Sequence, residues 1–93
     1  MKQVKFDFER IGTVDDFYLV AKRELELPEH FGKNLDALWD SLTGDIALPV
    51  SVQFVNLSMT QLETFEKIIS LFEEAAEELG DDFSFEYYLK PIY

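Results

Sequence analysis

Two aspartates one helical turn apart, Asp36 and Asp40, and the lone histidine His30 are the residues whose types and spacing could do chemistry. A carboxylate pair can act as acid and base in glycoside hydrolysis or hold Mg²⁺. A histidine can act as a general base where a pocket and an orienting partner hold it. Carboxylates can also bind a cationic partner through charge-assisted hydrogen bonds. Each alternative needs different surroundings in the chain.

The surroundings of these residues argue against an enzyme and against a metal site. Aspartates one turn apart on an exposed helix define no pocket, and the chain has no Gly-rich phosphate loop or nucleophile motif. One imidazole with carboxylates is a weak ligand set, and there is no cysteine. We therefore expect no catalytic residue, metal ion or cofactor. The aspartates form either a solvated polar face or a surface for a cationic partner.

The two aspartates belong to a predicted short helix between Asn34 and Gly44. Pro28 and Gly32 end the preceding segment, and Asn34 can cap the helix. Gly44 stands where a C-cap glycine belongs. The apolar positions have the i, i+3, i+4, i+7 spacing of a helix docked on a core: Leu35, Leu38, Trp39 and Leu42.

Asp36 and Asp40 fall with Thr43 on the other side of this helix, with Trp39 at the border. As an i, i+4 pair of like charges, the aspartates destabilise an isolated helix by about 0.2 to 0.5 kcal/mol. No Lys or Arg occurs from Asn34 to Glu66 to relieve the repulsion. We therefore expect a group outside this stretch to neutralise the two carboxylates.

Strands and helices alternate along the rest of the chain. Period-2 patterns predict strands over residues 4–8, 50–55 and 83–89, and helical spacing predicts helices over 13–25 and 58–79. Thr13 and Asp16 form a capping box, and Gly80 ends the last helix. The pattern near Thr64 fits either one long helix or a short helix leading into a longer one. The order β-α-α-β-α-β predicts an α/β fold with a small three-stranded parallel sheet packed with helices.

Length and composition predict a single folded domain over residues 1–93. The chain is 47% hydrophobic and 15% aromatic with four glycines, which argues against disorder. The absence of cysteine excludes a disulfide scaffold. The sequence has neither a signal-peptide pattern nor an apolar run long enough to span a membrane. We therefore expect a cytoplasmic protein.

The net charge of −11 is concentrated in the C-terminal two thirds of the chain. Residues 1–33 have a net charge of −1 and residues 34–93 a net charge of −10. Such a surface repels nucleic acid and anionic membranes and attracts a cationic protein, although acidity also serves solubility alone. A second acidic cluster lies at the end of the last helix, where the helix dipole favours cations: Glu73, Glu74, Glu77 and Glu78.

The run LPEHFGKNLDALWDSLTG, residues 27–44, resembles the signature segment of the barstar-like family, named after barstar, the intracellular inhibitor of the bacterial ribonuclease barnase. The core NLDALWD followed by LTG is long and ungapped, which makes the motif specific. The resemblance extends more weakly over nearly the whole chain. It implies three parallel strands with helices packed on them, which agrees with the fold read from periodicity.

The resemblance also implies a binding site. In this family the acidic helix and the preceding loop plug the ribonuclease active site, with carboxylates in place of substrate phosphates. That role falls on Asp36 and Asp40, with Asp40 as the central phosphate mimic. The remaining contact positions implied by the resemblance are His30, Trp39, Thr43, Gly44, Asp45, Glu74 and Glu78.

Two of these positions depart from the family pattern. His30 and Asp45 stand where aromatic residues are expected, which predicts a different and more basic target. The partner is then a cationic bacterial ribonuclease, secreted or used as a toxin, bound one to one by a chain that is monomeric when free. The alternative is a non-inhibitory binding or regulatory module of the same fold with a cationic partner.

Overall fold

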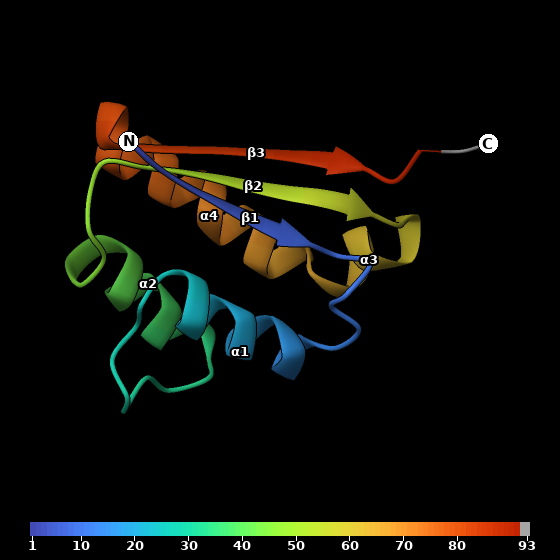
Figure 1. The fold of residues 1–93 in the computed structure, drawn as a ribbon, viewed down its shortest axis with the longest axis horizontal. Helices are drawn as coiled ribbons and strands as arrows, with labels where there is room; N and C mark the ends of the chain where they lie inside the picture. Colours follow the sequence, from blue (N-terminus) through green and yellow to red (C-terminus); the bar gives the residue numbers. More distant parts are fainter. Residues whose placement is uncertain (92–93) are drawn as a thin grey trace.

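Three parallel strands form the sheet on which the molecule is built. The computed structural model describes residues 1–91, with strands β1 (Lys2–Asp7), β2 (Val50–Leu57) and β3 (Phe83–Leu89). β2 lies in the centre and pairs in parallel with both neighbours (Figure 1). The predicted three-stranded parallel sheet is confirmed.

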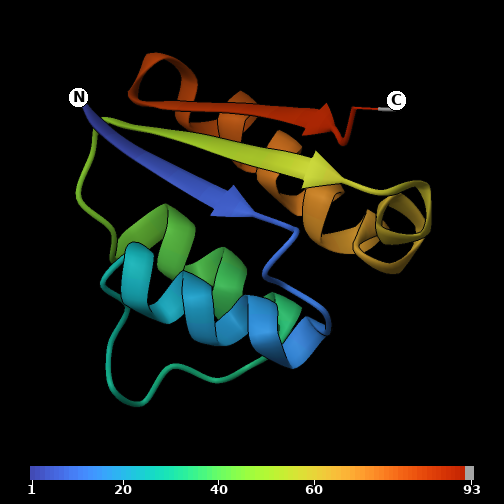
Figure 2. The ribbon, with the colours of Figure 1, turned by 45° about the vertical axis from the view of Figure 1, so that its right-hand side comes forward.

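The helices lie on one side of this sheet (Figures 1 and 2). The helices between β1 and β2 are α1 (Val14–Glu24) and α2 (Leu35–Gly44), and those between β2 and β3 are α3 (Met59–Thr64) and α4 (Glu66–Leu79), followed by the 3-10 turn η1 (Gly80–Asp82). Of the two patterns that the sequence allowed near Thr64, the structure has the short helix leading into a longer one. None of the helices described in residues 1–91 is long and apolar enough to cross a membrane.

Polar side chains define where most of the helices begin. The Thr13 hydroxyl accepts from the Asp16 N–H at 3.1 Å and completes the predicted capping box of α1. The Asn34 side chain accepts from the Ala37 N–H at 2.8 Å and caps α2, as predicted. At the far end of α4, Gly80 adopts φ 60° and ψ −129°, a conformation open to glycine.

The chain leaves α2 without a left-handed glycine. Gly44 is the last residue of the helix, and Asp45 is the C-cap with φ −109° and ψ −29°. The N–H groups of Asp45 and Ile46 both donate to the Ser41 carbonyl, at 2.9 and 3.2 Å. The prediction that Gly44 is the C-cap glycine is therefore wrong, because right-handed backbone at Asp45 already satisfies this carbonyl.

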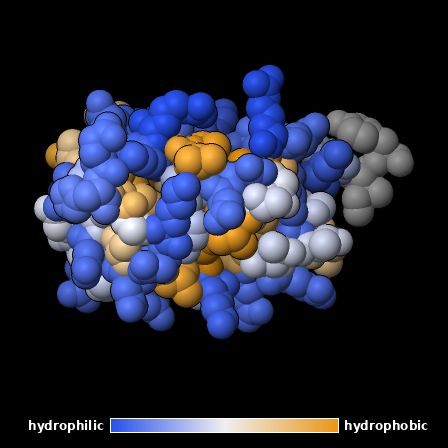
Figure 3. Space-filling view, turned by 90° about the horizontal axis from the view of Figure 1, so that it is seen from below, coloured by the Kyte–Doolittle hydropathy of each residue, from blue (hydrophilic) through white to orange (hydrophobic). Residues whose placement is uncertain are grey.

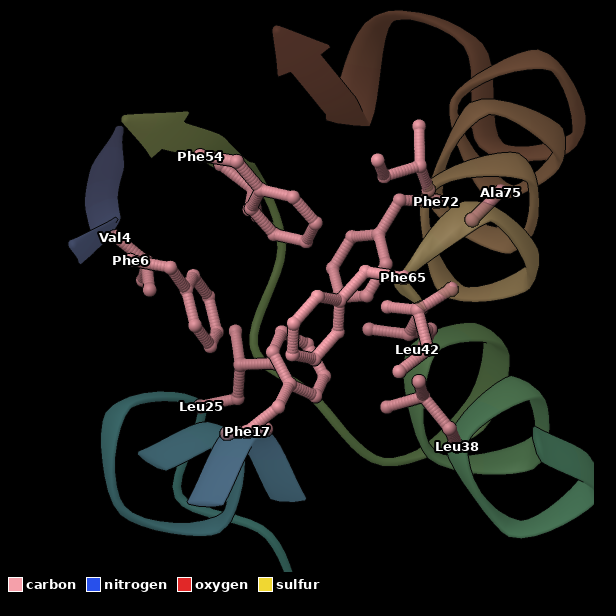
Figure 4. Packing of buried hydrophobic residues seen from close by; sticks show 14 of the residues in the cluster. Val4, Phe6, Phe17, Leu25, Leu38, Leu42, Phe54, Phe65, Phe72 and Ala75 are labelled. Carbon is pink, nitrogen blue, oxygen red and sulfur yellow. The ribbon is translucent and has the colours of Figure 1, made fainter. Parts of the chain in front are cut away.

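Phenylalanine side chains fill the space between the sheet and the helices (Figure 4). Phe54 from β2 lies 5.0 Å from Phe72 of α4 and 5.6 Å from Phe17 of α1, measured between ring centroids. Seven of the nine phenylalanines are at most 2% exposed: Phe6, Phe8, Phe17, Phe54, Phe65, Phe72 and Phe83. Together with Leu38 and Leu42 of α2, this cluster joins α1, α2 and α4 to the sheet in one core.

A hydrogen-bonded group closes the carboxyl ends of β1 and β2, and we call it the carboxyl-edge network. The Asp7 carboxylate accepts from the Asn56 side chain and from the Glu9 N–H, both at 3.0 Å. The Gln61 side-chain amide donates to the carbonyls of Phe8 and Ile11, both at 2.8 Å, and its oxygen accepts from the Ser58 N–H at 3.0 Å. This network ties the loop before α1 to the start of α3.

Candidate functional site

Helix α2 is anchored by one face and presents its two aspartates on the other. Leu38 and Leu42 are fully buried and point from α2 into the aromatic core (Figure 4). Asp36 and Asp40 are exposed, each two residues before one of these leucines. Because the buried leucines fix the rotation of the helix, both carboxylates are held toward solvent.

A shallow hollow between α2 and α4 brings these aspartates beside the second acidic cluster. It has a volume of about 580 Å³ and is lined by carboxylates and apolar side chains: Leu35, Asp36, Trp39, Asp40, Leu71 and Glu74. Helices α2 and α4 pack against each other, so the two acidic segments lie close together although β2 and α3 separate them in the sequence. We call Asp36, Asp40 and Glu74, with the half-buried Trp39 between them, the acidic surface.

The carboxylates of the acidic surface belong to no ion pair in the described part of the chain. Ion pairs in residues 1–91 join Lys2 to Glu26 at 2.9 Å, Lys22 to Glu29 at 3.7 Å and Arg23 to Glu24 at 3.4 Å. All six residues precede α2. We expected a group outside this stretch to neutralise the aspartates, but none of these ion pairs involves them, and Glu74 of α4 adds a third carboxylate to the hollow.

This arrangement suits the side chains of Arg and Lys on a partner. A guanidinium or ammonium group would find three carboxylates to accept its hydrogen bonds, and its aliphatic stem would contact Leu35, Trp39 and Leu71. Within residues 1–91 no three acidic or histidine side chains are grouped so that they could hold a metal ion. Carboxylates arranged in this way can accept hydrogen bonds from cationic groups.

Comparison with known proteins identifies the family. A family model described as "Barstar (barnase inhibitor)" matches residues 1–90. The chain belongs to the barstar family. A protein of Bacillus subtilis (strain 168) named "Putative ribonuclease inhibitor YrdF" is 40% identical to it over 80 residues, which cover 83% of this chain and 85% of that protein.

Three further positions that the resemblance implies as contacts, Thr43, Gly44 and Asp45, lie at the C-terminal end of α2. The half-buried Thr43 donates its hydroxyl to the Trp39 carbonyl at 2.8 Å, which fixes its side chain on the helix. Gly44 is exposed, and a Cβ added there would meet nothing within 4 Å. Asp45 is exposed and accepts a long hydrogen bond of 3.4 Å from the buried Ser41 hydroxyl. These three residues extend the exposed side of α2 beyond the hollow.

Two further positions that the resemblance implies as contacts, His30 and Glu78, do not line the hollow. His30 is exposed in the loop before α2, beside the half-buried Phe31 whose ring lies 6.1 Å from that of Tyr18. Glu78 is exposed one turn after Glu74 on α4 and does not line the hollow. The structure thus gathers Asp36, Trp39, Asp40 and Glu74 around the hollow, and neither His30 nor Glu78 lines it.

Sequence reasoning missed the apolar floor of the hollow between α2 and α4. Leu35 was expected in the core, yet it is half-buried and lines the hollow, and Leu71 was not singled out at all. Leu71 precedes Glu74 by three residues, so the two lie on one side of α4. In the sequence, the only sign of this arrangement is an apolar residue one turn before an exposed acid. It indicates a shared hollow only once α2 is known to pack against α4.

Proposed function

We propose that this chain inhibits a basic bacterial ribonuclease by covering its active site with the acidic surface. The observation that carries the proposal is the group of exposed carboxylates on two helices, Asp36, Asp40 and Glu74, which surround one hollow and have no ion-pair partner in residues 1–91. Membership of the barstar family and the likeness to a protein named as a ribonuclease inhibitor support it.

In the proposed complex the carboxylates replace substrate phosphates. A ribonuclease holds the phosphates of RNA with cationic side chains, and the same side chains would donate to Asp40 at the centre and to Asp36 and Glu74 beside it. Charge-assisted hydrogen bonds are short and directional, so the position of the carboxylates on rigid helices favours a defined complex. Binding would also relieve the repulsion between Asp36 and Asp40.

The periphery of the surface would adjust this interaction to one enzyme. Thr43, Gly44 and Asp45 at the end of α2, His30 in the preceding loop and Glu78 on α4 are the outer contacts of the proposal. His30 and Asp45 take the place of aromatic residues, which favours a more basic target than barnase. Ribonuclease and inhibitor would bind one to one.

The biological role that follows is protection of the cell that makes the enzyme or receives it. The inhibitor would act in the cytoplasm, as an immunity protein against a secreted ribonuclease or a ribonuclease toxin. Its net charge of −10 over residues 34–93 would accelerate association with a basic enzyme in a salt-dependent way.

The decisive experiment is a titration of ribonuclease activity. Barnase and any ribonuclease encoded beside this gene are titrated with the wild-type chain, with Asp40→Ala and with Glu9→Ala as a control. Glu9 is an exposed carboxylate that follows β1 and lies outside the acidic surface. We expect stoichiometric inhibition that Asp40→Ala weakens strongly and Glu9→Ala leaves intact.

Other outcomes of this titration have clear meanings. Equal inhibition by wild type and a folded Asp40→Ala variant would contradict the proposed site while leaving inhibition in place. If the chain binds a basic protein without inhibiting any ribonuclease, the regulatory module on the barstar fold becomes the better explanation.

A further inference from the structure

Strand β3 presents an exposed edge with large apolar side chains. It lies at one edge of the sheet and pairs with β2 alone within residues 1–91 (Figures 1 and 2). Three consecutive side chains near its end are exposed, Tyr87 by 43%, Tyr88 by 49% and Leu89 by 50%. An open strand edge of this kind is a template for pairing with a further strand.

The opposite edge of the sheet is better protected against such pairing. Strand β1 carries Lys2 and Lys5, and lysines on an edge strand discourage the approach of another strand. Strand β3 contains no base, and Lys90 and Pro91 follow only after it ends. Of the two edges, β3 is therefore the one open to a partner.

Backbone groups of β3 point away from the sheet at alternate residues. The Lys90 N–H donates to the Leu57 carbonyl of β2 at 2.8 Å. Because backbone groups alternate in direction along a strand, those of Phe85, Tyr87 and Leu89 point away from β2. A strand added along this edge could form hydrogen bonds with all three residues.

Apolar side chains of the same residues continue the aromatic core toward the edge. The Phe85 ring lies 4.8 Å from that of Phe54 in β2, and the Tyr87 ring lies 6.1 Å from that of Phe85, measured between ring centroids. Helix α4 packs against β3, yet Tyr87 and Leu89 remain exposed. A second strand with apolar side chains would cover them.

We propose that β3 pairs antiparallel with β3 of a second copy of this chain, about a twofold axis at Tyr87. In this register Tyr87 lies opposite the second copy's Tyr87, and Phe85 lies opposite the second copy's Leu89. The outward backbone groups then meet, and the apolar side chains pack as cross-strand pairs. A twofold axis at Glu86 would instead place two carboxylates directly opposite each other, which is destabilising.

The charge of this edge favours a second copy as the occupant. Within Phe83–Lys90 the charged residues are Glu86 and Lys90, so this stretch has a net charge of zero, whereas residues 34–93 have a net charge of −10. The side of the molecule away from β3, seen in Figure 3, has hydrophilic side chains around its apolar areas. Two acidic copies can thus meet along β3 without bringing an excess of like charges together.

This inference goes beyond the proposed function and does not depend on it. No residue of β3 lines the hollow between α2 and α4, so the pairing leaves the acidic surface to the ribonuclease, and each copy still binds one enzyme. From the sequence we expected a free monomer, and the exposed edge of β3 is the reason for a different proposal. An interface of one strand pair is small, so the dimer should dissociate on dilution.

Sedimentation velocity at increasing protein concentration tests the pairing. The variants are Tyr87→Lys and Tyr87→Glu, and the controls are Leu19→Lys and Leu19→Glu, which make the same changes at a side chain 53% exposed on α1. The twofold axis brings two identical side chains together at Tyr87, so each variant alone should repel itself. An equimolar mixture of the two variants pairs a lysine with a glutamate and should associate again.

We expect wild type and both Leu19 controls to dimerise alike, and each Tyr87 variant alone to associate about tenfold or more weakly. Salt should strengthen the dimer because both copies are acidic, whereas it should weaken the complex with a basic ribonuclease. Tyr88→Glu is a second variant that keeps the fold, since Tyr88 lies on the uncovered face of the sheet, opposite the second copy's Glu86 in the proposed register. It should also weaken the dimer.

Three results would overturn the proposal. The first is a wild-type chain that stays monomeric up to millimolar concentration. The second is self-association that the variants at Tyr87 and Tyr88 leave unchanged, which would place the interface elsewhere. The third is a monomeric wild type whose ribonuclease complex is weakened by Tyr87→Lys, because the edge would then bind the enzyme. Ribonuclease inhibition by the Tyr87 variants should equal that of wild type, so the inhibitor function is tested separately.

Discussion

Carboxylates of the carboxyl-edge network and of the acidic surface have opposite surroundings. Asp7 accepts hydrogen bonds from the Asn56 side chain and the Glu9 N–H, and these bonds, with a smaller contribution from the charge of Arg10, lower the pKa of its carboxyl group. Asp36 and Asp40, by contrast, repel each other one turn apart and have no ion-pair partner within residues 1–91. The Asp7 carboxylate, which stabilises the fold, is thus hydrogen-bonded within the chain, whereas Asp36 and Asp40 have no such stabilising partner in residues 1–91.

This difference indicates that the residues that stabilise the fold and the residues proposed to bind a partner lie in two different regions of the molecule. Polar groups of the carboxyl-edge network bond to each other and to backbone carbonyls, so losing one of them leaves a partner unsatisfied. The acidic surface rests on Leu38 and Leu42, whose burial does not depend on the charges beside them. Substitutions in the two regions should therefore change different measurable quantities.

Asp40→Asn should produce the largest change, and this change should appear in binding. Hydrogen bonds to charged groups contribute about 1.5 to 3 kcal/mol each, so losing the charge should weaken the ribonuclease complex by about a hundredfold or more. Asp7→Asn, the same substitution in the carboxyl-edge network, should leave affinity unchanged because Asp7 lies outside the acidic surface. Surface plasmon resonance with both variants checks the contrast, and equal affinities would contradict it.

Gln61→Ala should produce the largest loss of stability. Its side chain makes two hydrogen bonds to the carbonyls of Phe8 and Ile11 and one to the Ser58 N–H. At about 1 kcal/mol for each bond, we expect the free energy of unfolding to fall by about 3 kcal/mol. Urea denaturation measures this loss, and inhibition of the ribonuclease should stay intact at low temperature.

Gln53→Ala is the matched control for this prediction. Gln53 lies in β2 on the face of the sheet that no helix covers, beside Lys5 and Glu86 in the strand register. Its replacement should change the free energy of unfolding by no more than about 0.5 kcal/mol. Losses of equal size in the two variants would mean that the network does not have the structural role we assign to it.

Local patterns in the sequence predicted most of the fold. Strand β1 shows alternating burial because only one face of the sheet is covered, and Thr13 and Asn34 cap their helices through side chains a few residues away. By the same alternation, Tyr87 and Leu89 share one face of β3 with the buried Phe83. Their side chains are nevertheless 43% and 50% exposed, because the helical layer leaves the end of that strand uncovered. Periodicity predicts which face of the sheet a side chain lies on, but not how much of the strand the helices cover.

Local patterns could not predict contacts between residues that are far apart in the sequence. Gln61 reaches carbonyls 53 and 50 residues away, and nothing near it in the sequence indicates these partners. The meeting of Asp40 and Glu74 depends on how α2 packs against α4. The resemblance to the barstar family named Asp36, Asp40 and Glu74 as contacts, and their shared hollow became visible in the structure.

Acid should weaken the carboxyl-edge network through Asp7. The pKa of its carboxyl group is lower in the folded chain than in the unfolded chain, where it is near the ordinary value of about 3.9. The group therefore stabilises the fold above that value, and this stability is lost as the pH falls through the lower folded pKa. Urea denaturation from about pH 7 to about pH 2 should show a decline that is smaller in Asp7→Asn. An identical decline in the variant would contradict the assignment.

The smallest predicted effect is a gain in stability from a substitution on the acidic surface. Asp40→Asn removes one half of the like-charge pair in α2 and should raise the free energy of unfolding by about 0.2 to 0.5 kcal/mol. Asp36→Asn removes the same repulsion but also an acid from the first turn, where the helix dipole favours it, so its gain should be smaller. High salt should erase both differences because it screens exposed charges. If Asp40→Asn destabilises the chain at low salt, the fold depends on that carboxylate and the separation between the two regions is not real.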